Sequence, residues 1–408
     1  MRFGPIYVAF AAAYFLSYLY RTANAVISPD LTRELHLNPA SLGLLTGAYL
    51  LAFGLMQIPA GMLLDRFGPR RVEPVLLAVA AIGAIAFGLA DSLPALVAAR
   101  ALIGAGVCVC LMAPLKGIAM WYPAERQPSL AGWMMVAGGL GALAATAPLE
   151  ATLHITSWRT IFIVLGVATF VVALGIGWRV PDIRRPSHPP GFAWQWRGVR
   201  RIFANPRFWW IAPLAGIGMG SFMAIQGLWA VPWMIEVDGM TRAQAADRLL
   251  VLGLVIMAGY LSLGIFSLRL GKLGITSRHL FAFGFATHTV GLAAILLAIP
   301  GSYAWWSLYG IGAAVNVLAF TVLSAGFEKD LAARANTALN LLMFTGSFVA
   351  QWGIGVVAEL SRLHLGSDYG GGLRLAFAVV LALDALALAW FAYGWRRHAP
   401  SMHAAAAI

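Results

Sequence analysis

Long runs of apolar residues, separated by short polar or turn-forming segments, follow one another along the whole chain. The runs are continuous and do not alternate with polar residues, which favours helices over the strands of a membrane β-barrel. A helix needs about 20 apolar residues to cross a bilayer, and twelve segments satisfy this length: 5–27, 41–62, 73–91, 94–120, 129–153, 158–180, 208–235, 247–270, 278–299, 303–327, 331–360 and 373–395. We therefore predict an all-α membrane protein with twelve transmembrane helices.

A long polar segment near the middle of the chain divides these helices into two sets of six. It covers residues 181–207 and is rich in arginine and proline. No polar segment is large enough to fold as a separate soluble domain. We predict an N-terminal six-helix bundle over residues 1–180, a cytoplasmic middle loop over 181–207, and a C-terminal six-helix bundle with a tail over 208–408.

The composition excludes several classes of protein. Hydrophobic residues make up 61% of the 408 residues and charged residues 11%, whereas soluble domains carry about 25% charged residues. This excludes a soluble enzyme and a disordered chain. The two cysteines, Cys108 and Cys110, lie two positions apart on a predicted helix and cannot easily form a disulfide. Without a histidine cluster, a Gly-x-Ser-x-Gly motif or a Walker motif, we expect no enzyme, no ATP-driven pump and no cofactor.

The positive charges are distributed unequally between the two sides of the predicted membrane. With the N-terminus taken as cytoplasmic, 19 of the 28 Lys and Arg residues lie on the cytoplasmic side, six outside and three within helices. This asymmetry follows the positive-inside rule and predicts that both termini and the middle loop are cytoplasmic. Topology and attraction to anionic lipid account for the net charge of +12, so no nucleic-acid partner is expected. The excess of Arg over Lys indicates a GC-rich bacterial genome and hence the inner membrane.

The segment between the second and third predicted helices carries a family signature. It reads Gly-Met-Leu-Leu-Asp-Arg-Phe-Gly-Pro-Arg-Arg and resembles the major facilitator superfamily loop Gly-x-Leu-x-Asp-Arg-x-Gly-Arg-Arg, with Pro69 as the departure. The matching positions include Gly61, Asp65, Arg66, Gly68 and Arg70. The resemblance implies a gate, in which the Asp65 carboxylate accepts hydrogen bonds from a helix N-terminus of the other half or pairs with arginine. The alternative is that these arginines only set the topology.

A second signature lies in the fourth predicted helix. Arg100, Gly104 and Gly106 follow the pattern Arg-x-x-x-Gly-x-Gly, which resembles another motif of the same superfamily. We expect Arg100 to hold the helices together. A degraded copy of the first signature, Ser267–Gly274, lacks the aspartate and fits a duplicated second half. The resemblance covers the whole chain and implies two pseudo-symmetric six-helix bundles that transport a solute by alternating access.

The first predicted helix places a fixed positive charge inside the membrane. Helical spacing puts Tyr14, Ser17, Tyr18, Arg21 and Asn24 on one face. Charges within membrane helices are costly and mark substrate pathways, and arginine can hold a carboxylate or phosphate through two hydrogen bonds. The segment resembles the tyrosine-rich arginine pattern of organophosphate antiporters and organic-anion symporters, which implies contact with an anionic substrate. Alternatively, Arg21 extends to the membrane surface or pairs with an acidic residue.

Other polar residues fall on helices that the resemblance places around or beside a central cavity. Lys116 is a second candidate for neutralising the substrate, although it can instead extend to the cytoplasmic surface. Gln226 lies in the seventh helix, where Gly227 and a proline indicate a bend. Asn316 and Asn340 lie in the tenth and eleventh helices, and such residues also form hydrogen bonds between helices.

We predict a secondary transporter of a small organic or inorganic anion, acting as a monomer. Its partners would be the lipid bilayer and a small-molecule substrate, with transport coupled to protons or to a counter-anion. No carboxylate lies clearly in the predicted cavity. Asp384 falls on a helix expected to be peripheral, and so does His288, the other candidate for carrying a proton. This argues against a drug/proton antiporter driven by a carboxylate.

Three alternatives stay open. Met219 and Met223, with Cys108, Cys110 and Met112, offer soft ligands suited to a copper(I) importer, but a His-x-x-x-Met partner motif is absent. An exporter of apolar compounds would use the same fold. A membrane sensor or scaffold that transports nothing is the alternative from another class, and the lack of a soluble domain argues against it.

Overall fold

The computed structural model describes residues 3–123, 126–181, 197 and 200–398, and these residues contain helices but no strand. Among them, eleven helical segments are long and apolar enough to cross a membrane. The one predicted segment that is not among these eleven, 5–27, forms α1 (Phe3–Leu35), which packs against α6 and α8. The prediction of an all-α membrane protein is therefore confirmed.

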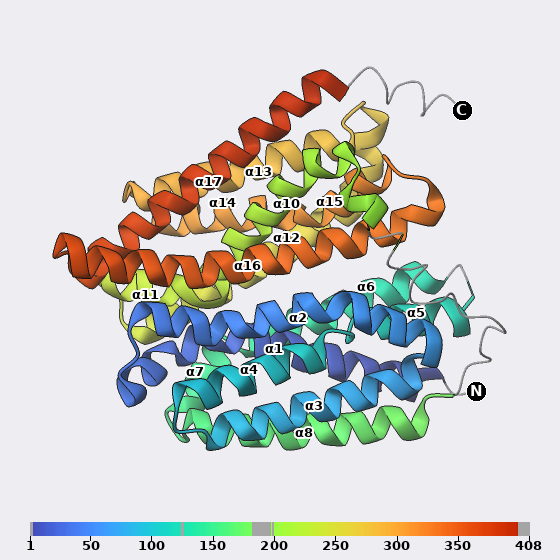
Figure 1. Ribbon diagram of the computed structural model, residues 1–408, viewed down its shortest axis with the longest axis horizontal. Coiled ribbons are helices and arrows are strands. Elements are labelled where there is room, and N and C mark those ends of the chain that lie inside the picture. The colour runs from blue at the N-terminus through green and yellow to red at the C-terminus, as the bar shows by residue number, and fades with distance from the viewer. Residues whose placement is uncertain (1–2, 124–125, 182–196, 198–199, 399–408) are drawn as a thin grey trace.

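The N-terminal helices form one group in Figure 1, coloured blue to green. They are α1, α2 (Pro39–Phe67), α3 (Pro69–Leu89), α4 (Leu93–Val107), α5 (Met112–Trp121), α6 (Gln127–Ala144), α7 (Ala147–Leu153) and α8 (Trp158–Arg179). Helix starts carry capping side chains: Asn38 accepts a hydrogen bond from the amide of Ser41, and Ser157 caps α8 in the same way. α4 with α5, and α6 with α7, each form one broken membrane segment.

The C-terminal helices form the second group, coloured lime to red. They are α10 (Pro206–Ala224), the π-helix η2 (Ile225–Trp229), α11 (Ala230–Glu236), α12 (Arg242–Lys272), α13 (Ser277–Leu296), α14 (Ser302–Ala314), η3 (Val315–Val317), α15 (Leu318–Ser324), α16 (Lys329–Leu365) and α17 (Tyr369–His398). Thr241 and Gln244 cap α12 reciprocally. The predicted bend of the seventh helix coincides with η2, which interrupts the segment Pro206–Glu236.

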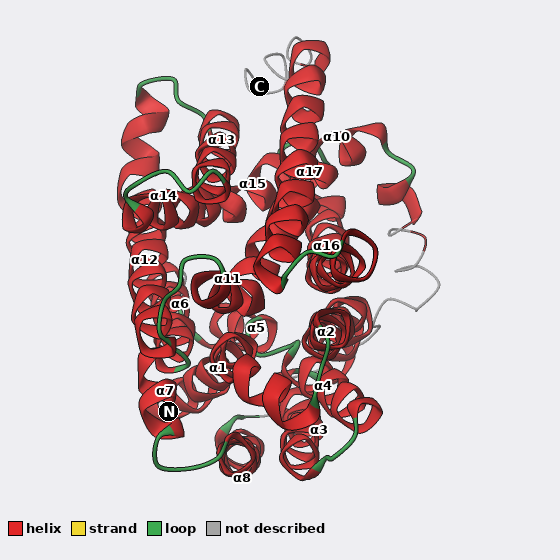
Figure 2. Ribbon diagram, turned by 90° about the vertical axis from the view of Figure 1, so that its left-hand side faces the viewer, coloured by secondary structure: helices red, strands yellow, loops and turns green. Residues whose placement is uncertain are grey.

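The two groups meet along α2 and α16, which lie side by side in Figure 2. Glycines allow this close approach. A Cβ atom on Gly43 would lie 2.7 Å from the carbonyl oxygen of Gln351, and one on Gly54 would lie 2.8 Å from Cβ of Phe344. Most of the predicted middle loop lies outside the described residues, so the boundaries at 181 and 207 stay a prediction.

Candidate functional site

Arg21 of α1 lies where the two groups of helices meet. Its guanidinium carbon is 4.6 Å from the ring centroid of Tyr18, 5.0 Å from that of Phe53 on α2 and 5.3 Å from that of Phe344 on α16. The side chain is half-buried, so part of it stays accessible. Arg21 is therefore held by aromatic faces from both halves of the chain.

No carboxylate compensates this charge in the part of the chain that the structure describes. The groups that interact with Arg21 include the phenols of Tyr14, Tyr18 and Tyr49, and Tyr49 also forms a hydrogen bond with the side chain of Arg21. Its Nε is buried and has no hydrogen-bond partner. Tyr260 of α12 approaches from the other half and is 43% exposed. A cation in this setting is available to an anionic ligand.

Three of the other predicted substrate contacts lie on elements that pack against the opposite half of the chain. Asn24 lies one helical turn from Arg21, is buried, and its Oδ1 has no hydrogen-bond partner. Asn340 of α16 donates a hydrogen bond of 2.8 Å to Oε1 of Gln57 on α2, so it joins the two halves. Gln226 lies within η2, and π-helical turns are frequent at functional sites.

Asn316 lies in η3, at the break of the tenth membrane segment. It is buried, and neither its Oδ1 nor its Nδ2 has a hydrogen-bond partner among the described residues. No direct contact of Asn316 or Gln226 with Arg21 is found in that part of the chain. Both stay predictions as substrate contacts.

Lys116 pairs with a carboxylate of its own half, and its role as a substrate contact stays a prediction. Its Nζ lies 2.6 Å from Oδ1 of Asp65 and donates a 3.0 Å hydrogen bond to the carbonyl oxygen of Leu64. The amine therefore caps the C-terminus of α2 and is neutralised by a carboxylate of its own half. The long lysine stem allows this, because it carries the charge toward the end of the membrane segment.

The signature loop makes its contacts within the N-terminal half. Gly68 joins α2 to α3 with a φ of 78°, a conformation that favours glycine. Arg70 donates to the carbonyl oxygen of Gly177 on α8 at 3.4 Å, and Arg66 is exposed beside the ring of Phe67. A Cβ atom on Gly61 would meet no other atom within 4 Å. Asp65 pairs with Lys116 of its own half, so its gating role stays a prediction.

Arg100 has a different environment from Arg21. It is fully buried, lies over the rings of Phe87 and Phe162, and donates to the carbonyl oxygen of Tyr20 at 3.3 Å. These residues belong to α3, α8 and α1, so Arg100 ties α4 to three helices of its own half. A Cβ atom on Gly104 would collide with the backbone of Tyr49 on α2.

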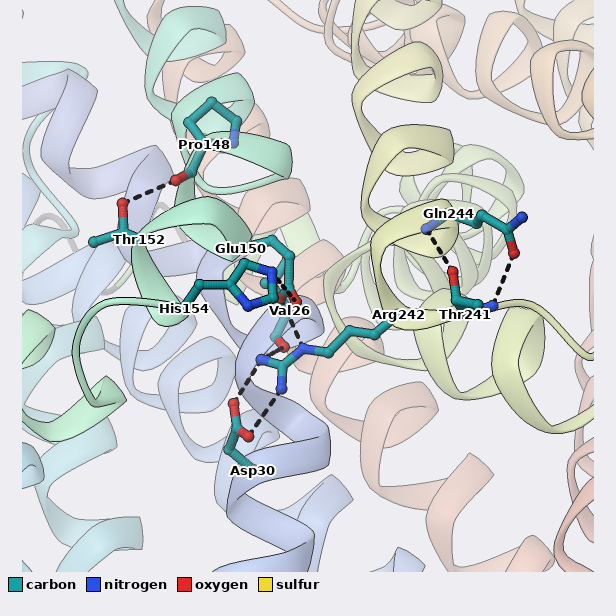
Figure 3. A network of polar contacts seen from close by, with 9 residues as sticks. All are labelled: Val26, Asp30, Pro148, Glu150, Thr152, His154, Thr241, Arg242 and Gln244. Carbon is teal, nitrogen blue, oxygen red and sulfur yellow. Dashed lines mark hydrogen bonds and ion pairs between the residues drawn. The ribbon is translucent and has the colours of Figure 1, made fainter.

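A polar cluster that was not predicted joins the two halves at the end of α1 (Figure 3). Arg242, at the start of α12, donates hydrogen bonds of 2.8 and 2.5 Å to the two oxygens of Asp30 and one of 2.7 Å to Oε2 of Glu150. It also donates to the carbonyl oxygen of Val26. Asp30 belongs to α1 and Glu150 to α7, so one arginine of the C-terminal half holds two carboxylates of the N-terminal half. We call this the Arg242 cluster.

The copper alternative gains no support from the structure. Met223 is buried in the hydrophobic core, and Cys108 and Cys110 are both buried and unbridged. The backbone carbonyl oxygen of Met219 accepts a hydrogen bond from the hydroxyl group of Ser347. Across the described residues, no group of three or more His, Cys, Asp or Glu side chains is placed to hold a metal ion.

Comparisons with known proteins agree on one family. The sequence profile of the Major Facilitator Superfamily matches residues 10–351. The hexuronate transporter of Escherichia coli K12 is 28% identical over 250 residues, which is 57% of this chain and 57% of that protein. A probable sulfoacetate transporter of Cupriavidus necator is 28% identical over 165 residues, 40% of this chain and 37% of that protein. The chain thus matches little more than half the length of the first of these relatives and about a third of the second.

One solved structure shares the arrangement of helices over nearly the whole chain. It is a bacterial homologue of the human lysosomal transporter Spinster, in an inward-facing and occupied conformation. The TM-score is 0.75 and the sequence identity 19%, with 96% of each chain covered. At this identity the likeness establishes the fold alone.

Proposed function

Because the chain belongs to the Major Facilitator Superfamily, we propose that it is a secondary transporter that moves a small organic anion across the membrane by alternating access. It is a multi-pass membrane protein, with eleven candidate spans among its described residues. Its curated relatives are named for hexuronate and sulfoacetate, which carry a carboxylate or a sulfonate. The proposal rests on Arg21.

Arg21 provides a reason to prefer an anion to a neutral or apolar substrate. A guanidinium group stays protonated and can hold a carboxylate or sulfonate through two parallel hydrogen bonds. A charge inside a membrane protein that no opposite charge neutralises is costly, and an anionic substrate would offset that cost. The phenol of Tyr18, which is only partly buried, can bind a polar group on the rest of the substrate.

The position of Arg21 also fits alternating access. Its aromatic neighbours Phe53 and Phe344 belong to opposite halves, so a relative movement of the halves changes what surrounds the guanidinium group. The Arg242 cluster would hold the halves together at one end of the molecule. Substrate would then reach Arg21 from the other end.

The test is ligand binding and uptake by purified protein, with D-galacturonate and sulfoacetate as anions and D-galactose as a neutral control. A ligand that binds the folded state raises its melting temperature. We expect at least one anion to stabilise the wild type and to be taken up into proteoliposomes. Arg21→Gln should abolish both effects while the protein still folds and inserts. Arg33→Gln, the same change at an exposed position of the same helix, should leave both intact. Normal anion uptake by Arg21→Gln would refute the proposal.

A further inference from the structure

A second group of polar side chains lies inside the C-terminal half, away from Arg21. His288 of α13 and Asp384 of α17 are both completely buried, and Nε2 of the histidine is 3.6 Å from Oδ2 of the aspartate. Neither oxygen of Asp384 has a hydrogen-bond partner among the described residues. A buried imidazole beside a buried carboxylate inside a membrane segment needs an explanation, because such groups are costly there.

The other ring nitrogen of His288 fixes where its first proton lies. Nδ1 is 3.3 Å from the carbonyl oxygen of Tyr309 on α14, and a carbonyl oxygen only accepts, so Nδ1 carries the hydrogen. The ring of Tyr309 stacks on the imidazole at 4.2 Å between centroids. Nε2 is therefore the ring nitrogen without that hydrogen, and it faces Asp384 and Ser221.

Ser221 of α10 can respond to that proton. Its Oγ lies 3.2 Å from Nε2 of His288 and 3.1 Å from the carbonyl oxygen of Gly218. A hydroxyl group has one hydrogen to donate. With neutral His288, Ser221 can donate to Nε2. With protonated His288, Nε2 becomes the donor, and the serine hydrogen turns to Gly218.

The charge balance of the pair favours holding one exchangeable proton while it is buried. With that proton the pair is neutral overall, either as a carboxylic acid and an imidazole or as a carboxylate and an imidazolium. Without it, a single buried negative charge remains, which is costly. Two elements that pack near the pair place a polar side chain beside it: α14 the phenol of Tyr309 and α10 the hydroxyl of Ser221. Residues 315–324, which form η3 and α15, contain no titratable side chain. In the part of the chain that the structure describes, the groups that interact with Asp384 are His288, Ser221 and Tyr309, none of which carries a permanent positive charge.

We propose that His288 and Asp384 form a proton-binding site that couples proton movement to transport through Ser221. The proposal rests on the proposed transport function. Ser221 is followed after three residues by η2, which packs against α1, the helix that carries Arg21. A change in the hydrogen bonds of Ser221 is thus transmitted along one continuous segment to the interface of the halves. Release of the proton requires a conformation in which water reaches the pair.

Transport assays in proteoliposomes separate coupling from substrate movement. With D-galacturonate as probe and the membrane potential clamped, a symporter of one proton accumulates substrate about tenfold per unit of pH gradient. We expect the wild type to accumulate D-galacturonate when a pH gradient is present. At equal pH on both sides, it should exchange external for internal D-galacturonate. Asp384→Asn and His288→Gln should lose gradient-driven accumulation but keep exchange. Asp247→Asn, an exposed control on α12, should keep both.

Infrared difference spectra test the pair without any substrate. Between about pH 5 and about pH 8, the wild-type difference spectrum should contain a band of the carboxyl group or of the imidazole ring that Asp384→Asn removes or shifts. A band unchanged by Asp384→Asn would overturn the proposal, as would full gradient-driven accumulation by that variant. Equal loss of accumulation and exchange in folded His288→Gln would also overturn it. Absence of probe transport by the wild type would count against the proposed function, while the spectra still judge the pair.

Discussion

At the scale of single residues, two arginines within the N-terminal half show how surroundings decide a role. Arg100 donates to a backbone carbonyl and is enclosed by helices of its own half. Arg21 remains accessible, and residues of both halves surround it. The sequence predicted that both arginines lie within membrane segments, because each interrupts a long run of apolar residues. It did not predict Phe53, Phe344 or Tyr260 near Arg21, because contacts between distant helices leave no local pattern.

Replacement of Arg21 by lysine separates charge from geometry. Lys keeps the positive charge but cannot form two parallel hydrogen bonds to one carboxylate or sulfonate. We expect Arg21→Lys to weaken anion binding about tenfold, or about 1.4 kcal/mol, without abolishing it. Calorimetric titration with D-galacturonate and sulfoacetate measures this change. Equal affinity in the two proteins would show that the two-hydrogen-bond geometry contributes nothing.

At the scale of helices, hydrophobic runs and turn residues predicted the membrane segments well, but not their interruptions. The predicted segment 94–120 corresponds to α4 and α5, which are separated at residues 108–111. The bend in the seventh helix was predicted from Gly227, although its π-helical form was not. Such breaks depend on packing against neighbouring helices, so composition alone does not locate them.

Close helix contacts predict the effect of adding one methyl group at Gly104. A Cβ atom there would collide with the backbone of Tyr49, which cannot move as a flexible side chain does. We expect Gly104→Ala to lower the stability by about 1–3 kcal/mol, the usual cost of overpacking. The matched control is Gly61→Ala, because a Cβ atom at Gly61 meets nothing within 4 Å. Thermal melting of the purified variants measures the difference, and equal melting temperatures would show that α4 and α2 move apart freely.

At the scale of the whole molecule, interactions between the halves were the least predictable feature. Arg242 was noted in the sequence only as one of the basic residues on the predicted outer side. Its partners Asp30 and Glu150 lie more than ninety positions earlier in the chain. A single sequence gives no sign of such a pairing, because opposite charges at loop ends are common. The same holds for the hydrogen bond between Gln57 and Asn340.

The Arg242 cluster predicts how the equilibrium between conformations responds to one substitution. Arg242→Gln leaves the buried carboxylate of Glu150 without its cation, which costs about 1–3 kcal/mol in the conformation that contains the cluster. Conformations in which the halves have separated at this end do not bear that cost. The population of these separated conformations relative to the conformation that contains the cluster should therefore rise about fivefold or more.

Spin labels at Arg33→Cys and Ala243→Cys, both exposed and close to the cluster in sequence, report this separation once Cys108 and Cys110 are replaced by alanine. We expect Arg242→Gln to add a longer-distance population to the pulsed electron resonance spectrum. Arg248→Gln is the matched control, because Arg248 bonds to Ser302 within its own half at 2.6 Å. Identical distance distributions in Arg242→Gln and the wild type would mean that the cluster does not hold the halves together. A shift in both variants would trace the change to the general loss of positive charge on α12.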